Sequence, residues 1–347
     1  MPQAGASRLR GMLVGMKLRN LGSSGLRVSG LALGAMTFGR SADERVAARM
    51  VDRYLEAGGN FIDTANVYAN GASEEMLGRI LEGRRQLVAI ATKVCGPMGA
   101  GPFDRGLSRK HILEQVEGSL RRLRTDHIDL YQIHSWDYLT PIEETMAALD
   151  DCVRAGKVRY LGASNVTGWQ LATAQGVAER AGGARFVALQ PEYSLLQRGL
   201  ERELTEAAAY HGLGMLPWSP LAGGLLTGKY RAGEEPPEGS RGNEALRGPW
   251  AAAWKSRATD HAFRVVQGVE AVAESVGRPV LEVALRWVMQ KPGVIAPILG
   301  ARTEEQLVQQ LRVLEWSLDD ASMKQLDALS AQDPGYPYNL LASRPRS

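Results

Sequence analysis

The segment IDLYQIHSWDYLTPIEETMAALDDCVRAGKVRYLGAS, residues 128–164, contains one complete strand–helix–strand unit. Its two ends, IDLYQIH (128–134) and RYLGAS (159–164), are short apolar runs with the length of buried strands. Between them, PIEETMAALDDCVRAG (141–156) has helical spacing, with a proline at its start and an Ala-Gly pair at its end. This order predicts two parallel strands joined by a right-handed helical crossover.

The same alternation of apolar runs and amphipathic stretches extends along the chain. The six further apolar runs, which bring the total to eight, are residues 31–36, 60–64, 87–93, 186–190, 214–219 and 294–300. Eight strands alternating with helices predict a single-domain (β/α)8 TIM barrel of the α/β class. The alternative is a doubly wound open sheet, which usually carries a glycine-rich phosphate loop after its first strand. GAMTFGRS, residues 34–41, follows that strand without a G-x-G-x-x-G pattern, which favours the barrel.

Two segments lie outside this alternation. KLRNLGSSGLRVS, residues 17–29, predicts a short N-terminal β-hairpin that turns at Ser-Ser-Gly. The long stretch GGLLTGKYRAGEEPPEGSRGNEALRGPW, residues 223–250, follows the seventh strand and is rich in glycine, proline and charge. A loop of this length is usually a lid, a binding loop or disordered. We expect residues 1–15 to be a peripheral extension and residues 16–347 to form the barrel domain.

Composition narrows the classes of partner. The net charge of the 347 residues is +3, from 41 basic and 38 acidic side chains, so neither nucleic acid nor an anionic membrane is expected as partner. No apolar run approaches the roughly 18 residues of a membrane-spanning helix, and the N-terminus lacks the apolar core of a secretory signal. Two cysteines, Cys95 and Cys152, are too few for a disulfide framework and favour a cytoplasmic location. The histidines show no metal-binding spacing, and the sequence leaves homo-oligomer formation open.

Polar side chains occur at the C-terminal ends of the predicted strands, where the active sites of TIM barrels lie. The second strand ends at Asp63, and Tyr68 lies on the loop that follows. The third and fourth strands end at Lys93 and His134. The later strand ends supply Ser164, Asn165, Gln190, Trp218, Ser219, Gly300 and Arg302. Because strand ends converge in a barrel, we expect these side chains to share one bowl.

Four of these side chains suit one chemical task. A buried carboxylate and a buried ammonium are each costly alone, so Asp63 and Lys93 on adjacent strands should pair. The Lys93 charge should then depress the pKa of Tyr68 from its ordinary value of about 10 and make the phenol a usable proton donor. His134 would add a hydrogen bond. Such a group can protonate a carbonyl oxygen, and the hydride must come from a nicotinamide because no side chain supplies one.

Each residue also has a structural interpretation. An isolated Asp63–Lys93 pair could simply stabilise the barrel, and His134 could be a satisfied core histidine. The Ser164-Asn165 pair could cap a helix. Arg302 could likewise be a solvated charge at a helix start. The joint occurrence of these residues at strand ends favours catalysis over each separate structural role.

The chain resembles the aldo-keto reductases over residues 17–330. Asp63, Tyr68, Lys93 and His134 match the catalytic tetrad of that family in order, spacing and strand position. The stretches that resemble its cofactor motifs are GASN (162–165), LQPEYSLLQR (189–198), PWSPLAGGLLTGKY (217–230) and GARTEEQLVQQL (300–311). The GLLTGKY and GAR forms are most similar to the bacterial and channel-β-subunit-like branches.

The resemblance implies a role for each residue of a cofactor groove. The residues that would hold the nicotinamide carboxamide and stack on its ring are Ser164, Asn165, Gln190 and Trp218. The residues that would line the pyrophosphate path are Ser219, Leu221, Gly223 and Lys229. The residues that would surround the adenosine end are Gly300, Arg302, Gln306, Gln309 and Gln310. The residues that would lie beneath the reacting centre are Gly34 and Met36, and those that would face the substrate are Met36, Tyr68 and Trp136.

The resemblance also implies the cofactor and two alternative functions. Many family members have lysine at the position of Gly300, so Arg302 would contact the 2′-phosphate here, which favours NADP(H) over NAD(H). The first function is an NADP(H)-dependent reductase that converts small-molecule aldehydes or ketones to alcohols, with Tyr68 as proton donor. The second is an NADPH-binding regulatory or sensor subunit with slow turnover, as the likeness to channel β-subunits suggests.

Overall fold

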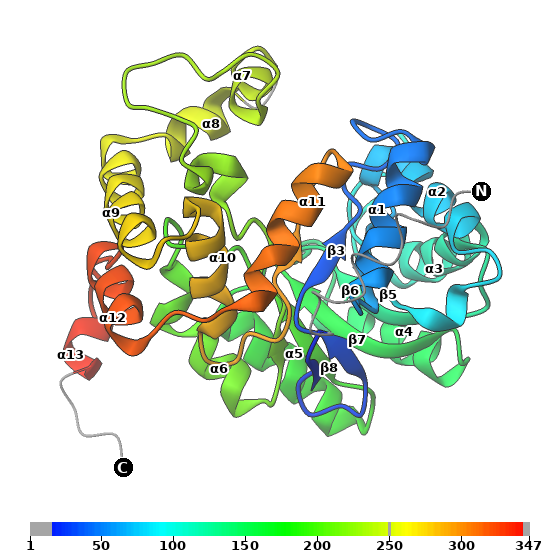
Figure 1. Ribbon diagram of the computed structural model, residues 1–347. Coiled ribbons are helices and arrows are strands. Elements are labelled where there is room, and N and C mark those ends of the chain that lie inside the picture. Colours follow the sequence, from blue (N-terminus) through cyan, green and yellow to red (C-terminus); the bar gives the residue numbers. More distant parts are fainter. Residues whose placement is uncertain (1–15, 249–250, 343–347) are drawn as a thin grey trace, which may run out of the picture.

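The computed structural model describes residues 16–248 and 251–342, and its centre is a sheet of eight parallel strands (Figure 1). In sheet order the strands are β10 (Ile298–Leu299), β3 (Ala32–Gly34), β4 (Phe61–Asp63), β5 (Ala89–Val94), β6 (Ile128–Ile133), β7 (Val158–Ser164), β8 (Phe186–Gln190) and β9 (Gly214–Met215). Each strand coincides with one of the eight predicted apolar runs. From β3 to β9, neighbours in the sheet are also neighbours along the chain, and the one long connection among these strands is the segment with the long loop between β9 and β10.

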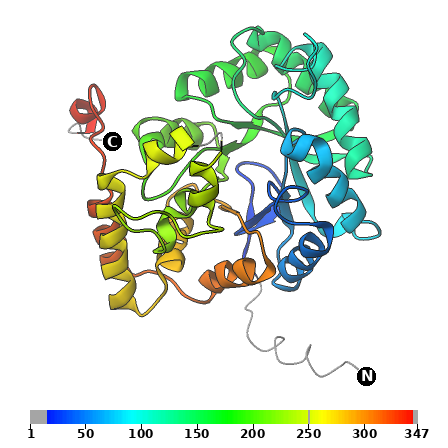
Figure 2. The same ribbon diagram turned by 90° about the horizontal axis from the view of Figure 1, so that it is seen from above.

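Main-chain hydrogen bonds join the two edges of the sheet. The amide of Met215 donates to the carbonyl of Gly293 at 2.9 Å, and the amide of Ile295 donates back to Met215 at 2.9 Å. The amide of Ile298 donates to Pro217 at 2.8 Å. Figure 2 shows the resulting ring of strands surrounded by helices. The (β/α)8 barrel is therefore confirmed, and the open doubly wound sheet is excluded.

Helices cover the outside of the barrel. The helices that alternate with the strands or follow them are α1 (Glu44–Glu56), α2 (Ala72–Ile80), α3 (Arg109–Leu123), α4 (Ile142–Arg154), α5 (Gly168–Ala181), α6 (Leu204–Tyr210), α9 (Asp260–Val276), α10 (Val280–Gln290), α11 (Glu304–Leu311) and α12 (Asp320–Leu329). Their apolar faces join the outward strand residues, such as Ile90 and Tyr131, in one continuous core. This packing of helices on a closed sheet leaves the strand ends free to carry chemistry.

Side chains that point into the barrel form a second, smaller core. It includes Phe61 of β4, Ala91 of β5, Leu130 of β6 and Ala188 of β8. Because strand side chains alternate between faces, the residue two positions later also points inward. Those residues are Asp63, Lys93, Gln132 and Gln190. The strand period alone therefore places one polar layer directly above the apolar layer of the barrel interior.

The N-terminal hairpin closes the other end of the barrel. Its strands β1 (Leu18–Asn20) and β2 (Arg27–Ser29) pair antiparallel, which confirms the predicted hairpin. Leu21 and Val28 are fully buried and belong to the inner core. Figure 1 shows this dark-blue hairpin at the end of the barrel opposite the long loop. The expected peripheral extension, residues 1–15, lies outside the described residues.

The long loop after β9 contains short helical elements. These are the 3-10 helix η4 (Ala222–Thr227) and helix α7 (Arg241–Leu246), and α8 (Ala251–Arg257) follows directly. The C-terminal part of the chain adds a further short helix, α13 (Tyr338–Ala342). Figure 1 shows α7 and α8 standing above the rest of the molecule. In the described part of the chain, no helix has both the length and the apolar character needed to cross a membrane.

Candidate active site

A buried ion pair between β4 and β5 forms the centre of the site. Lys93 Nζ lies 2.5 Å from Asp63 Oδ1 and donates to the main-chain carbonyl of Thr64 at 2.8 Å. The exposed fractions of the two side chains are 0% for Lys93 and 4% for Asp63. Burial alone would lower the pKa of Lys93, but the charge of Asp63 and the phenol of Tyr68 raise it above its ordinary value. The predicted pair is confirmed, and the lysine is charged at neutral pH.

Tyr68 lies beside this ammonium because the chain reverses sharply after β4. It opens the 3-10 helix η1 (Tyr68–Gly71), in which Ala69 and Asn70 have left-handed φ angles of 50° and 53°. Such angles cost free energy for residues other than glycine, so the reversal is a strained element next to the ion pair. Lys93 Nζ donates to the Tyr68 hydroxyl at 3.4 Å and lies 5.0 Å from the ring centroid.

The pKa of Tyr68 corrects one expectation from the sequence. Burial of the phenol raises its pKa above the ordinary value, and the Lys93 charge lowers it only in part. The predicted depression of this pKa is therefore wrong in this structure, because desolvation outweighs attraction by the ammonium. Tyr68 consequently stays protonated at neutral pH. Lys93 still limits the rise, and it favours the phenolate once a proton has left.

His134 completes the set from the end of β6. Its ring lies edge-on to the ring of Tyr68, with 5.8 Å between the centroids. Burial, together with the positive charge of Lys93, lowers the pKa of His134 to about 3. The imidazole is therefore neutral at physiological pH, with one nitrogen available as a hydrogen-bond donor and the other as an acceptor. The four predicted tetrad residues are thus brought together at one end of the barrel.

Two glutamines hold the second oxygen of Asp63. Gln190 Nε2 donates to Asp63 Oδ2 at 2.7 Å, and Gln132 Nε2 donates to the same oxygen at 3.3 Å. Gln190 was expected to bind a nicotinamide carboxamide; its amide contacts the tetrad in this structure, and the cofactor contact stays a prediction. Gln132 was not among the residues predicted from the sequence. The signal that could have found it is its inward position on β6, two residues before His134.

Hydrogen bonds through Asn165 link three strand ends. Asn165 Nδ2 donates to the His134 carbonyl at 2.8 Å and to Ser164 Oγ at 3.1 Å. Asn165 Oδ1 accepts from the indole of Trp218 at 3.1 Å. Ser164 Oγ in turn donates to the Gln190 carbonyl at 2.8 Å. The residues expected to meet a nicotinamide therefore lie next to the tetrad, as the strand-end rule predicts.

The loop after β9, which was predicted to line the pyrophosphate path, contains several left-handed turns. Ser219, Ala222, Gly223 and Gly224 all have positive φ angles, and Ser219 Oγ accepts from the Gly223 amide at 3.1 Å. The amides of Ala222 and Gly224 donate to the carbonyls of Ser219 and Leu221, both at 2.8 Å, so hydrogen bonds within the loop hold these turns, and contact with a pyrophosphate stays a prediction. Leu221, predicted to line the same path, is partly buried. Predicted Lys229 is exposed, with its amine 5.1 Å from the centroid of the Tyr230 ring.

The predicted adenosine-end residues gather around β10 and α11. Gln310 Nε2 donates to the Gly300 carbonyl at 2.9 Å, and Gln306 Oε1 accepts from the Arg302 amide at 2.9 Å. Gln310 Oε1 is buried without a hydrogen-bond partner in the described part of the chain. Such an atom is costly unless a ligand or water satisfies it. Gln309 is exposed on the same helix.

An arginine cluster beside this end was missed by the sequence analysis. The pKa of Arg241 is lowered, first by partial desolvation and then by the charges of Arg257, Arg302 and Arg40. Arg241 is nevertheless exposed. Arg257 pairs with Glu192 at 2.9 Å, whereas Arg241 has no ion pair within the described ranges. Excess positive charge next to an unsatisfied glutamine oxygen could hold the adenosine end of a phosphorylated dinucleotide.

The predicted residues Gly34, Met36 and Trp136 lie at or just after the C-terminal ends of β3 and β6, and their contact with a substrate stays a prediction. Gly34 pairs with Asp63 in the β3–β4 register, and a side-chain carbon at Gly34 would lie only 2.8 Å from Ile298. Met36, two residues further, is 40% exposed. Trp136 is partly buried and packs edge-on against Trp169, with 5.6 Å between the ring centroids. Trp169 is a further aromatic side chain that the sequence analysis did not select.

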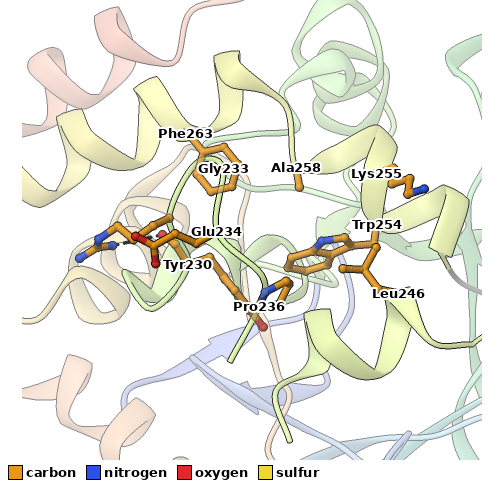
Figure 3. Close-up of a pocket in the computed structure, with 10 residues that line it drawn as sticks. Tyr230, Gly233, Glu234, Pro236, Leu246, Trp254, Lys255, Ala258 and Phe263 are labelled. Atoms are coloured by element: carbon orange, nitrogen blue, oxygen red, sulfur yellow. Dashed lines mark hydrogen bonds between the residues drawn. The ribbon is translucent and has the colours of Figure 1, made fainter. Parts of the chain in front are cut away.

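A separate cavity lies beneath the long loop (Figure 3). Aromatic and aliphatic side chains such as Tyr230, Trp254 and Phe263 line it, and none of its lining residues belongs to the tetrad. Trp254 packs edge-on against Tyr230, with 4.8 Å between the centroids. The side chains around this cavity therefore support the long loop and α7. Among the described residues, no group of three or more His, Cys, Asp or Glu side chains could hold a metal ion.

Comparison with known proteins places this geometry in a family context. A model of the aldo/keto reductase family matches residues 30–331. YrpG, an uncharacterized oxidoreductase of Bacillus subtilis (strain 168), is 41% identical over 323 residues, which cover 90% of this chain and 95% of that protein. A probable voltage-gated potassium channel subunit beta of Oryza sativa subsp. japonica is 39% identical over 305 residues, or 86% of this chain and 92% of the relative. An aryl-alcohol dehydrogenase (NADP(+)) of Phanerodontia chrysosporium is 33% identical over 336 residues, or 91% of this chain and 86% of the relative.

Proposed function

The chain belongs to the aldo/keto reductase family, whose members are oxidoreductases that use a nicotinamide cofactor, and from this premise we propose that it reduces aldehydes or ketones to alcohols with NADPH. The observation that carries the proposal is the ammonium of Lys93, which is held by Asp63 and lies 3.4 Å from the Tyr68 hydroxyl. A relative named as an NADP(+) aryl-alcohol dehydrogenase supports the same reaction class and cofactor.

The proton for the product oxygen would come from Tyr68. Its raised pKa keeps the phenol protonated at neutral pH, so Tyr68 already carries the proton when the substrate binds. Loss of that proton creates a phenolate next to Lys93, and the buried ammonium stabilises it where water cannot screen the charge. Asp63 prevents Lys93 from becoming an unpaired buried cation. The ion pair therefore acts at the step in which negative charge develops.

His134 would orient the carbonyl by a hydrogen bond. Because its pKa is lowered to about 3, the imidazole is neutral and does not compete with Tyr68 as an acid. A neutral donor next to the phenol can polarise the carbonyl oxygen without adding a second buried cation beside Lys93. Trp136 and Trp169 would limit water at the mouth of the site.

A bound nicotinamide supplies the hydride that no side chain of the protein can provide. Asn165, Ser164 and Trp218 would hold its ring beside the tetrad, since these residues are already linked by hydrogen bonds. As the family resemblance implies, Ser219, Leu221, Gly223 and Lys229 would line the path of the pyrophosphate. The arginines around Arg241 would bind the phosphate of the adenosine end.

A panel of carbonyl compounds with NADPH tests the proposal. The expected result is loss of NADPH absorbance with at least one aldehyde or ketone, together with an alcohol product. The Tyr68→Phe variant should bind NADPH and show almost no turnover. NADPH binding without turnover of any carbonyl by the wild type would contradict the enzyme proposal, and the absence of NADPH binding would contradict the cofactor proposal.

The channel-subunit relative motivates a second candidate function. A chain 39% identical to a probable potassium channel subunit beta could bind NADPH and report the nucleotide state to a partner while turning over slowly. Tight NADPH binding with negligible turnover across the carbonyl panel would favour this regulatory subunit. The homo-oligomeric state of the protein is a second property to measure when the two functions are compared.

Cys95 and Cys152 are both free thiols, and we propose a reducing compartment such as the cytoplasm for either function.

A further inference from the structure

One ion pair joins the long loop to the adenosine end of the site. Arg302 Nη1 and Nη2 lie 2.7 Å from Glu244 Oε1 and Oε2, respectively, so the guanidinium and the carboxylate form a bidentate pair. Arg302 Nη1 also donates to the Gly239 carbonyl at 3.2 Å. The exposed fraction of the Arg302 side chain is only 24%, although that of Glu244 is 56%. The pair therefore fastens α7 to the loop that follows β10.

The position of Glu244 is set by the support of α7. Ser240 caps the N-terminus of the helix, because its Oγ accepts from the Asn243 amide at 3.2 Å. The Gly242 amide donates to the Tyr230 hydroxyl at 3.1 Å. A side-chain carbon at Gly242 would come within 2.5 Å of Trp254, so the helix rests directly on that indole. Figure 3 shows Tyr230 and Trp254 as the aromatic floor beneath the loop.

Around the Arg302–Glu244 pair, arginines outnumber the carboxylates that pair with them, which favours binding of an anion. The charges of Arg40, Arg257 and Arg302 all lower the pKa of Arg241, and among the described residues the carboxylates that pair with these arginines are Glu192 on Arg257 and Glu244 on Arg302. Glu244 is thus the carboxylate that occupies Arg302, the residue expected to bind a 2′-phosphate. A carboxylate and a phosphate use the same bidentate face of a guanidinium, so they compete for it.

We propose that Glu244 sets the dinucleotide preference of this protein by competing with the 2′-phosphate for Arg302, so that NADP(H) and NAD(H) are discriminated only weakly. The inference rests on the proposed cofactor function. Binding of NADPH must separate Glu244 from Arg302 and bring a phosphate near the displaced carboxylate. Binding of NADH leaves the pair intact, and a carboxylate near the ribose can accept a hydrogen bond from the 2′-hydroxyl.

The direct test compares dissociation constants for NADPH and NADH in nucleotide titrations. Glu244→Gln retains the size of the side chain and removes its charge, so NADPH should bind roughly three- to fivefold more tightly, the upper part of the range expected for a partly exposed charged pair. NADH should bind equally well or more weakly. Glu235→Gln is the matched control, because it removes the same charge from an exposed position of the same loop and should leave the ratio unchanged.

A double-variant cycle guards against an indirect effect. Arg302→Gln should weaken NADPH and leave NADH nearly unchanged, and in that background Glu244→Gln should no longer tighten NADPH. Adenosine 2′,5′-bisphosphate and AMP serve as probes that need no nicotinamide contacts, and the bisphosphate alone should respond to Glu244→Gln. The proposal is overturned if Glu235→Gln and Glu244→Gln change the NADPH dissociation constant equally. It is also overturned if Glu244→Gln changes the ratio of the NADPH and NADH dissociation constants by less than about twofold.

Hydrogen exchange of the nucleotide-free protein separates this proposal from the proposed function. Glu244→Gln should raise amide exchange in residues 241–246, because the pair no longer fastens α7, and Glu235→Gln should not. If the wild type binds neither nucleotide, the cofactor function fails even where exchange responds as expected. If both nucleotides bind, but Glu244→Gln changes neither the ratio of their dissociation constants nor the amide exchange of residues 241–246, then the proposed role of Glu244 is wrong and the cofactor function still stands.

Discussion

Gln190 donates a hydrogen bond from Nε2 to Asp63 Oδ2 at 2.7 Å, although the two residues are 127 positions apart in the chain. The other oxygen of Asp63 binds Lys93, so the carboxylate is held at both ends. A glutamine amide is a neutral donor, and it therefore satisfies the carboxylate without cancelling the charge that balances Lys93. β8 thus supports an ion pair that is built on β4 and β5.

This relationship predicts a structural role for Gln190 in addition to any cofactor contact. Gln190→Met retains the volume and removes the donor, so the free energy of unfolding should fall by about 1–3 kcal/mol, the usual cost of an unsatisfied buried group. The turnover number should fall as well, because Asp63 loses its fixed orientation. Urea unfolding and kinetics at saturating NADPH measure both effects. Unchanged stability with a raised NADPH dissociation constant would instead indicate that Gln190 acts on the cofactor alone.

Removing the Tyr68 hydroxyl should separate chemistry from binding. Tyr68→Phe leaves the ring in place, so NADPH should bind as before while carbonyl reduction falls by roughly 10²- to 10⁴-fold, the usual contribution of a general acid. Single-turnover rates and nucleotide titrations provide the measurement. Tyr210→Phe is the control, because that tyrosine is 87% exposed and far from any proposed role. A Tyr68→Phe enzyme with near-normal reduction would show that another group donates the proton.

Removing the Lys93 ammonium should affect both stability and activity. Lys93→Met leaves the Asp63 carboxylate buried and unpaired, which should cost about 3–5 kcal/mol in unfolding free energy. The double variant Asp63→Asn with Lys93→Met should regain most of that stability. It should stay inactive, because no cation remains to stabilise the Tyr68 phenolate. Recovery of activity together with stability in the double variant would refute the electrostatic role of Lys93.

The pKa of His134 predicts how stability depends on pH. It is lowered to about 3 in the folded protein, whereas a histidine in an unfolded chain titrates near about 6.5. Between these values the unfolded chain binds more protons, so the stability linked to neutral His134 is complete above about pH 6.5 and is lost as the pH falls toward 3. His134→Asn should flatten the unfolding free energy in this window. An equally steep pH dependence in the variant would contradict the assignment.

The hairpin beneath the barrel makes a prediction about folding. Gly22 has a φ of +56°, and a side-chain carbon there would lie 2.4 Å from the Val187 carbonyl and 2.5 Å from the Gly212 carbonyl. Gly22→Ala should therefore destabilise the protein by roughly 2–4 kcal/mol through strain and overpacking. Gly25→Ala in the same turn is the control, because its added carbon meets no atom within 4 Å. Thermal or urea unfolding of the two variants measures the difference, and equal stability would mean that the hairpin adapts freely.

The periodic pattern of the chain predicted most of the fold. Eight apolar runs alternating with helical stretches correspond to the eight strands from β3 to β10, because burial in a closed sheet demands that pattern whatever the details of packing. The strand period also explains why Asp63 and Lys93 point inward, since each lies two residues beyond an inner core residue. The pairing of these two residues could therefore be predicted from order alone.

The amino-acid order by itself determined the barrel, the hairpin and the strand ends at which the tetrad residues stand, because these depend on local periodicity and on the closure of parallel strands. Only the tertiary structure decided the raised pKa of Tyr68, the two glutamines on Asp63 and the pairing of Arg302 with Glu244. The pKa depends on how much water surrounds the phenol, and the contacts depend on distances between residues far apart in the chain. Neither quantity has a signature in the spacing of residue types.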